Sequence, residues 1–291
     1  MQLSEIIYRP YTWESTPSEP IAETMRKAEK GDAVSCWRMA NYFYGHEEKA
    51  PAGNWKVIKR DFTKSIEWAK KAASLGCTAG YAFLGNIYSN NESANKIKRD
   101  YVKAAEYYRT GYQLGDNHCG YELADLLMSH NLDTYTGNKF EEALEILLNI
   151  ISQVEKPEHD PAYIEFASKI GECYSTIGEF EKALEWYQKA SRKEFHNEIR
   201  ELQSIIRIHR NIPKWEKAYE KGANLPTALK AAKGYFTLVS SCNQYQYSEN
   251  ALKWMKLSSA LLECEQFYID SAIKLLEPLP STDAPHPHEN S

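Results

Sequence analysis

Few residues of this chain combine the type and the spacing that catalysis requires. Cys119 directly follows His118, and a thiol beside an imidazole is the pairing of a nucleophile with its base. On a helix, however, adjacent side chains point about 100° apart, so these two would not face each other. Glu141 and Glu142 fall on an expected solvent face, where nothing would bury them. We therefore interpret Cys119 as a structural cysteine and the two carboxylates as solvated charges.

Metal and nucleotide chemistry lack their usual patterns. None of the motifs GxGxxG, GxxxxGK[ST], HExxH and GxSxG occurs. The 6 cysteines are spread singly without a CxxC, which is typical of reduced core cysteines. His286 and His288 lie in a proline-rich segment, and we interpret them as incidental. The sequence predicts no enzyme, no metal and no cofactor.

Charge and hydropathy exclude two further classes of function. A net charge of −5 over 291 residues gives no polyanion-binding signature, so nucleic acid is not expected as the main ligand. No stretch approaches the ~20 uninterrupted apolar residues that cross a bilayer. The start, MQLSEIIYRP, lacks the basic region and apolar run of a secretory signal. These features predict a cytoplasmic protein without membrane insertion.

The elements that must position any functional residue follow a repeat. The stretch DFTKSIEWAKKAASLG at 61–76 reappears thirty-nine residues later as DYVKAAEYYRTGYQLG at 100–115, and weaker copies follow. In each copy an aromatic residue precedes a small one by three positions, and a bulky residue comes three later. A fixed period of this size is the signature of a helical repeat array. The aromatic residues that open the four copies are Phe62, Tyr101, Phe140 and Phe180.

Two stretches carry a family resemblance. Residues 79–88 (AGYAFLGNIY) followed by residues 100–108 (DYVKAAEYY) resemble the SEL-type, or Sel-one-like, repeat of the tetratricopeptide superfamily. Gly76 and Gly115 stand where that family has its closing glycine, and residues 178–190 look like an ordinary tetratricopeptide unit. The resemblance implies an all-α fold, a right-handed α-solenoid of antiparallel helix-hairpin repeats. It also implies a concave surface, lined by the first helix of each hairpin, that binds other proteins.

The resemblance and the turn signals divide the chain into three parts. Residues 1–17 form an N-terminal arm that we expect to pack on the first repeat. Residues 18–277 form a single helical-repeat array. The match is good over about 28–195 and weak over 215–262, and residues 196–277 contain degenerate repeats and a capping helix. Residues 278–291 are proline-rich and almost free of apolar residues, which predicts a disordered tail.

The implied concave groove defines a first candidate site. In each first helix we count from its small residue. The side chains that face the groove would then lie three residues before it, one residue after it and four residues after it. Trp37 and Tyr121 could equally be inter-repeat packing residues, whereas Asn41 and Asn86 recur at one position. Some members of the family bind the C-terminal carboxylate of a chaperone in this groove, and Asp125 would repel such a group. The candidate partner-binding residues are Trp37, Asn41, Tyr44, Asn86, Ser89, Tyr121, Asp125, Met128 and Glu172.

Two long expected loops offer an alternative site. The basic runs KVIKR and KIKR end immediately before Asp61 and Asp100, and loop insertions often gather on the binding face of a solenoid. These basic runs could bind an anionic patch of a partner, or they could form a charged rim that keeps the loops soluble. We favour the charged rim. The alternative partner-binding residues are Trp55, Lys56, Lys59, Arg60, Lys96, Lys98 and Arg99.

The sequence thus predicts a protein-binding helical-repeat module. Its acidic balance and long loops favour a bacterial immunity or adaptor protein that sequesters one cognate toxin or effector, a basic one in particular. A general assembly scaffold or regulator of a multiprotein complex is the alternative, and an enzyme of unknown chemistry is the remote one. We favour a monomer and leave the oligomeric state open.

Overall fold

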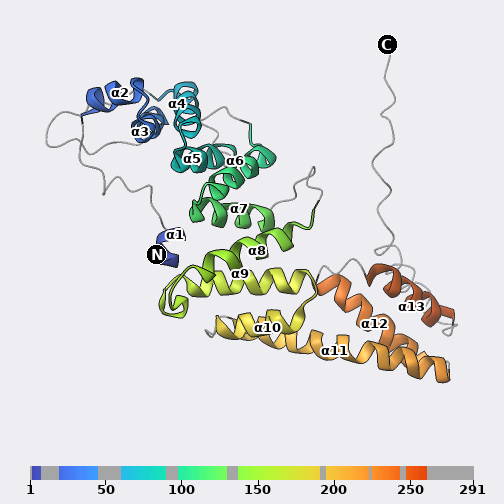
Figure 1. Ribbon diagram of the computed structural model, residues 1–291. Helices are drawn as coiled ribbons and strands as arrows, with labels where there is room; N and C mark the ends of the chain where they lie inside the picture. Colours follow the sequence, from blue (N-terminus) through green and yellow to red (C-terminus); the bar gives the residue numbers. More distant parts are fainter. Residues whose placement is uncertain are drawn as a thin grey trace, which may run out of the picture. The chain divides into compact units, whose positions relative to one another are not determined.

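The computed structural model describes residues 2–7, 20–44, 60–89, 98–129, 137–190, 195–222, 225–242 and 247–260. Within these ranges every regular element is a helix, which confirms the all-α fold (Figure 1). None of the described helices has both the length and the apolar character needed to cross a bilayer. Contacts divide the chain into two compact units, Met1–Cys173 and Tyr174–Ser291, which we call unit 1 and unit 2.

Unit 1 is a succession of helix pairs. Helix α3 packs on α4, α5 on α6 and α7 on α8, and each pair also contacts the next. The helices follow one another along the unit in chain order (Figure 1). The helices are α1 (Leu3–Ile7), α2 (Ile21–Glu29), α3 (Ala33–Tyr44), α4 (Phe62–Ser74), α5 (Thr78–Ser89), α6 (Tyr101–Gln113), α7 (Asn117–Ser129), α8 (Lys139–Ser152) and α9 (Tyr163–Thr176), with a 3₁₀ turn at Pro157–His159.

The residues that open and close the repeats act as their types predict. The Asp61 carboxylate accepts from the backbone N–H of Lys64 at 3.0 Å, and Asp100 accepts from that of Lys103 at 3.0 Å. Both contacts are N-caps that satisfy a free donor of the first helical turn. At four turns between consecutive helices the backbone is left-handed, where glycine costs least. The φ angles there are 91° at Gly31, 82° at Gly76, 93° at Gly115 and 89° at Gly178.

The small residues inside the repeats mark the closest approach of paired helices. A Cβ atom at Gly85 on α5 would lie 2.6 Å from Cδ1 of Tyr108 on α6, so only glycine fits against that buried ring. In the preceding pair, the Ser65 hydroxyl donates to the Ala40 carbonyl at 2.7 Å. In both pairs a small residue of the first helix therefore lies against the second helix.

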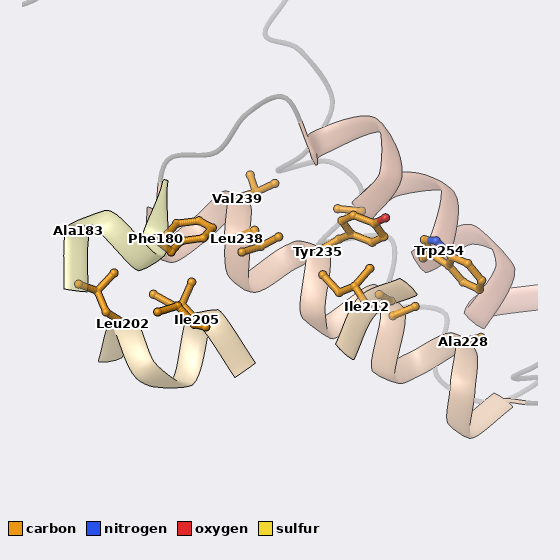
Figure 2. Close-up of a cluster of buried hydrophobic side chains, with 14 residues drawn as sticks. Phe180, Ala183, Leu202, Ile205, Ile212, Ala228, Tyr235, Leu238, Val239 and Trp254 are labelled. Carbon is orange, nitrogen blue, oxygen red and sulfur yellow. The ribbon is translucent and has the colours of Figure 1, made fainter. Parts of the chain in front are cut away.

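Unit 2 contains α10 (Phe180–Lys189), α11 (His196–Lys221), α12 (Leu225–Cys242) and α13 (Ser248–Ala260). Their apolar faces share one core (Figure 2). Ala183, three residues after the opening Phe180, is the small residue of its copy and is fully buried. Ala251, followed three residues later by Trp254, repeats this small-to-bulky spacing and is fully buried in the same core. The degenerate repeats thus retain the packing of the regular ones.

Helix α11 differs from the sequence-based expectation. A proline in a helix interior removes a hydrogen bond and usually breaks the helix, so Pro213 favours two helices, at 195–210 and 215–222, but a single helix of 26 residues passes through it. The residues on either side of the proline explain the difference. Ile212 and Trp215 both pack against Gly234 on α12, where a Cβ atom would lie 2.9 Å and 3.1 Å from them. Packing against α12 therefore keeps the helix continuous through a residue that disfavours it.

The N-terminal arm also differs from the expectation. Its described part, residues 2–7, lies against α7 of the third pair rather than on the first repeat. The Ile6 carbonyl lies 2.8 Å from Nδ1 of His118, and the Ser4 N–H donates to Asp160 at 3.1 Å. Residues 8–17, the expected capping helix at 264–276 and the expected tail at 278–291 lie outside the described residues. The single array over 18–277 stays a prediction.

Candidate partner-binding surface

A row of side chains joins the first helices of two consecutive repeats. We call this row the α7–α9 ladder, and its members lie about one helical turn apart along each helix. The Tyr121 hydroxyl donates to Glu165, Lys169 forms an ion pair with Asp125, and Cys173 donates to the Met128 sulfur at 3.6 Å. Aromatic, charged and thioether groups therefore meet along one face of unit 1.

The ladder has a cation at its centre. The Lys169 ammonium pairs with Asp125 and also lies 5.5 Å from the centre of the Tyr121 ring, within the range of a cation–π contact. Burial and the hydrogen bond to Glu165 both raise the pKa of Tyr121, so its phenol stays a donor. The site already holds one cation by a carboxylate and an aromatic face.

Carboxylates outnumber the cations around that lysine. Glu122 lies on α7 with its Oε1 3.9 Å from Nε2 of His118. Burial raises the pKa of the Glu122 carboxyl, and Asp125 and Glu165 raise it further against the opposing effect of His118 and Lys169. Burial likewise raises the pKa of Glu172 on α9. The resulting surface is acidic and partly desolvated.

The structure brings together part of the predicted groove set. Tyr121, Asp125 and Met128 occupy one face of α7 and meet α9. Glu172 lies on α9, where the charge of Lys169 lowers the pKa of its carboxyl and that of Asp125 raises it. That this face contacts a partner stays a prediction.

The two recurring asparagines have partners within the fold. Asn41 is buried, and its amide donates to the Trp37 carbonyl one turn earlier at 2.9 Å. Asn86 accepts from the Tyr108 hydroxyl on α6, and Ser89 donates to the Asn86 carbonyl at 3.2 Å. The repeated amides are therefore hydrogen-bonded within the fold, Asn41 inside its own helix and Asn86 to the paired helix, and that they contact a partner stays a prediction.

The two aromatic candidates on α3, Trp37 and Tyr44, are half-buried and pack against core clusters. Tyr44 makes edge-on contacts with Phe62 and Phe83, each with ring centres 5.5 Å apart. Trp37 packs against two clusters of buried side chains, one around Met39 and one around Ala40. The packing interpretation therefore accounts for both residues.

The loop alternative is described only in part. Arg60 and Lys98 are exposed, and Arg99 donates to the Tyr101 hydroxyl at 2.5 Å with its guanidinium 5.3 Å from that ring. The remaining members, Trp55, Lys56, Lys59 and Lys96, lie outside the described residues.

Three residues of the ladder were missed from the sequence, namely Glu165, Lys169 and Cys173. The sequence-based prediction used the same offsets from the small residue on every first helix. In the structure, other positions of α9 contact Tyr121, Asp125 and Met128 on α7. The i, i+4, i+8 spacing of the three missed residues marks one stripe of a helix and was the available signal. Two of these three residues, Glu165 and Lys169, are charged, so periodicity alone could not separate the stripe from a solvated face.

The thiol and imidazole singled out in the sequence face different neighbours. Nδ1 of His118 contacts the Ile6 carbonyl, whereas Cys119 packs against Gly111 on α6, where a Cβ atom would lie 3.0 Å from the cysteine Cβ. Cys36, Cys77, Cys119 and Cys173 are free thiols. In the described part of the chain, no group of three or more His, Cys, Asp or Glu residues is arranged to hold a metal ion.

Several solved structures resemble this chain. A Sel1 repeat protein from Oxalobacter formigenes is 14% identical, with 82% of this chain and 78% of that chain covered and a TM-score of 0.41. The protein c5321, a protective antigen present in uropathogenic Escherichia coli strains and displaying an SLR fold, is 17% identical, with 91% and 60% covered and a TM-score of 0.44. A Sel1 repeat protein from Klebsiella pneumoniae subsp. pneumoniae is 16% identical, with 89% and 100% covered and a TM-score of 0.36. A search of curated proteins found no match.

Comparison with family models gives a residue-level match. The Sel1 repeat matches residues 33–77, 78–116 and 178–195. The first two stretches coincide with the pairs α3–α4 and α5–α6, including their closing glycines, and the third contains α10. Sel1-repeat folds are generally protein–protein interaction modules. The chain therefore carries Sel1 repeats, in the helical-hairpin form that the structure shows.

Proposed function

We propose that this protein binds a basic protein partner through the α7–α9 ladder. One observation carries the proposal: Glu122, Asp125, Glu165 and Glu172 surround a single lysine that is already held by a carboxylate and an aromatic ring. Complementary charge speeds encounter and selects partners, and an aromatic residue among polar ones is typical of an interface hot spot. A lysine or arginine side chain of the partner would meet the excess carboxylates.

The role we propose for this binding is sequestration of one cognate toxin or effector, as an immunity or adaptor protein. An acidic surface raises the association rate with a basic partner, and rapid capture is what neutralisation needs. A general assembly scaffold or regulator is the second candidate, and the Sel1 repeats support it equally. The two roles differ in the number of partners and in their stoichiometry.

Affinity purification from the native cell, read out by mass spectrometry, tests the proposal. The baits are the wild-type protein, the ladder variant Asp125→Asn/Glu172→Gln and the control variant Glu106→Gln/Glu145→Gln. The control removes the same two charges from exposed positions on the second helices α6 and α8. We expect a basic protein bound by wild type and control, with at least about tenfold weaker binding to the ladder variant, a difference of about 1.4 kcal/mol.

Thermal melting of each variant separates a lost contact from a lost fold. A partner that binds the ladder variant as tightly as the wild type would place the interface elsewhere. One partner at one-to-one stoichiometry supports sequestration, whereas several partners of comparable affinity support a scaffold. Binding to a basic partner should also weaken as salt rises from 0.05 to about 0.5 M, because exposed charges are screened.

A further inference from the structure

Unit 2 contains a groove of its own, formed by two helices. It lies between α10, the second helix of its hairpin, and α11, and has a volume of about 550 Å³. That volume is in the range of pockets that hold small ligands or short peptide segments. Its floor is formed by the apolar side chains of Leu184 and Ile206, which belong to or pack on the unit 2 core.

The α11 wall of this groove is cationic. Arg207, Arg210 and Lys214 follow one another at i, i+3 and i+7, and therefore lie on one face of the helix. The α10 wall supplies two carboxylates, Glu181 and Glu185. Three cations thus face two carboxylates, the reverse of the excess at the α7–α9 ladder.

Only one of the three cations is neutralised by a close contact in the described part of unit 2. Arg210 donates twice to one oxygen of Glu181, from Nε at 3.1 Å and from Nη2 at 2.9 Å. Lys214 donates to the amide oxygen of Asn211 at 3.3 Å, which leaves its charge uncompensated. Arg207 is exposed one turn before the Arg210–Glu181 pair. The Arg210–Glu181 ion pair therefore lies between Arg207 and Lys214, and these two cations can still bind an anion.

Primary amides complete the lining. Gln188 on α10 and Gln203 on α11 face the groove, together with Asn211. An amide side chain both donates and accepts, so it matches the alternating N–H and C=O groups of an extended peptide backbone. Cations, amides and an apolar floor together form a surface for a peptide that carries one carboxylate, since only a peptide also offers the apolar side chain and the backbone groups that the floor and the amides would contact.

We propose that the α10–α11 groove binds an extended segment of a partner protein that carries a carboxylate next to an apolar side chain. The carboxylate pairs with Arg207 or Lys214, the apolar side chain covers Leu184 and Ile206, and the amides bond the backbone. The inference is independent of the proposed role of the ladder, because the two surfaces select opposite charges and share no residue.

Selection of a random dodecapeptide phage library on the full-length protein tests this directly. We expect the selected peptides to be enriched in Asp or Glu beside Leu, Ile, Val or Phe. Their binding, measured by fluorescence anisotropy, should fall at least about tenfold for Arg207→Gln/Lys214→Gln. The control Lys217→Gln/Lys233→Gln removes two exposed cations of α11 and α12 that do not line the groove and should bind as the wild type does.

A double-mutant cycle identifies the contact. Replacing the peptide's carboxylate by its amide should weaken binding to the wild type about tenfold and leave binding to Arg207→Gln/Lys214→Gln nearly unchanged. A selection without acidic enrichment, or equal effects of the peptide change on both proteins, would overturn the proposal. A dimer in sedimentation that the groove variant dissociates would also overturn it, because the groove would then hold a second copy of this chain.

Discussion

At the scale of single residues, Gly85 shows how an absent side chain fixes the packing of a repeat. A Cβ atom there would overlap the Tyr108 ring, which is 1% exposed and hydrogen-bonded to Asn86. Gly85→Ala should therefore lower the free energy of unfolding by about 1–3 kcal/mol through overpacking, although alanine favours the helix. Urea unfolding measures the change.

Gly222→Ala is the matched control for that substitution. Gly222 has an extended backbone with φ −171°, and a Cβ atom there would meet nothing within 4 Å. The control should stay within about 0.5 kcal/mol of the wild type. Equal stability of Gly85→Ala and the wild type would contradict the tight α5–α6 contact.

The Glu122 carboxyl links the stability of unit 1 to pH. Burial raises its pKa in the folded protein above the usual value of 4.5, so folding favours the protonated form. Its stabilising contribution is complete below the unfolded pKa and is lost as the pH rises through the folded pKa. Glu122→Gln should therefore melt at a higher temperature than the wild type at pH 7, and the difference should shrink below about pH 4.5.

Thermal melts from pH 3 to pH 8 check this expectation. Glu106→Gln on the exposed face of α6 serves as the control and should show a small difference at every pH. A Glu122→Gln variant that is less stable at pH 7 would mean that the contact with His118 outweighs the cost of burying the charge.

Residue types alone could not separate ligand contacts from structural ones. Asn41 and Asn86 recur at one position of the repeat, yet their amides bond Trp37 and Tyr108. The sequence shows that a polar group lies on a helix face, but its partner comes from a neighbouring turn or helix. Lys169 is the opposite case, because the sequence analysis did not select it. Its contacts with Asp125 and Tyr121 depend on how α7 and α9 are offset.

At the scale of helices, one carboxylate joins three elements of unit 2. Oε1 of Glu216 on α11 accepts from the Tyr235 hydroxyl on α12 at 2.9 Å and from Nε1 of Trp254 on α13 at 3.0 Å. Tyr219, one turn away on α11, packs edge-on against Trp254 with ring centres 5.0 Å apart. Both donors are largely buried, so neither can turn to water.

Glu216→Ala should therefore lower the free energy of unfolding by about 1–3 kcal/mol or more, because it leaves buried donors without their acceptor. Chemical denaturation followed by tryptophan fluorescence reports the loss, since Trp254 is itself a donor. Glu220→Ala removes an exposed carboxylate from the same helix and should have an effect below about 0.5 kcal/mol. If the two variants lose equal stability, Glu216 does not hold α11 to its neighbours.

Helix ends and helix continuity differ in how well the sequence predicts them. Asp61 and Asp100 begin helices as their type and position predicted, because an N-cap bonds its own first turn. Pro213 also carries a strong local signal, but its helix continues because Ile212 and Trp215 pack on α12. Local signals fail where a contact distant in sequence contributes more free energy than the local preference.

At the scale of the whole molecule, the period predicted the hairpins but not their grouping into units. The thirty-nine-residue repeat predicted where α4 and α6 begin, because each copy makes the same local contacts. The division between Cys173 and Tyr174 falls inside α9, where no turn or composition signal occurs. It arises from which helices share a core, and that depends on packing beyond one repeat.

Because the chain forms two compact units, we expect a substitution that unfolds one repeat to destabilise the other repeats of the same unit. Each repeat of such an array contacts its neighbours only, so unfolding propagates from one pair to the next. Gly85→Trp would separate α5 from α6 because the indole cannot fit beside Tyr108. Hydrogen exchange followed by mass spectrometry should then show faster exchange throughout α4–α7, while α11–α13 keep wild-type protection. Equally fast exchange in α12 and α5 would show that the two units unfold as one cooperative body.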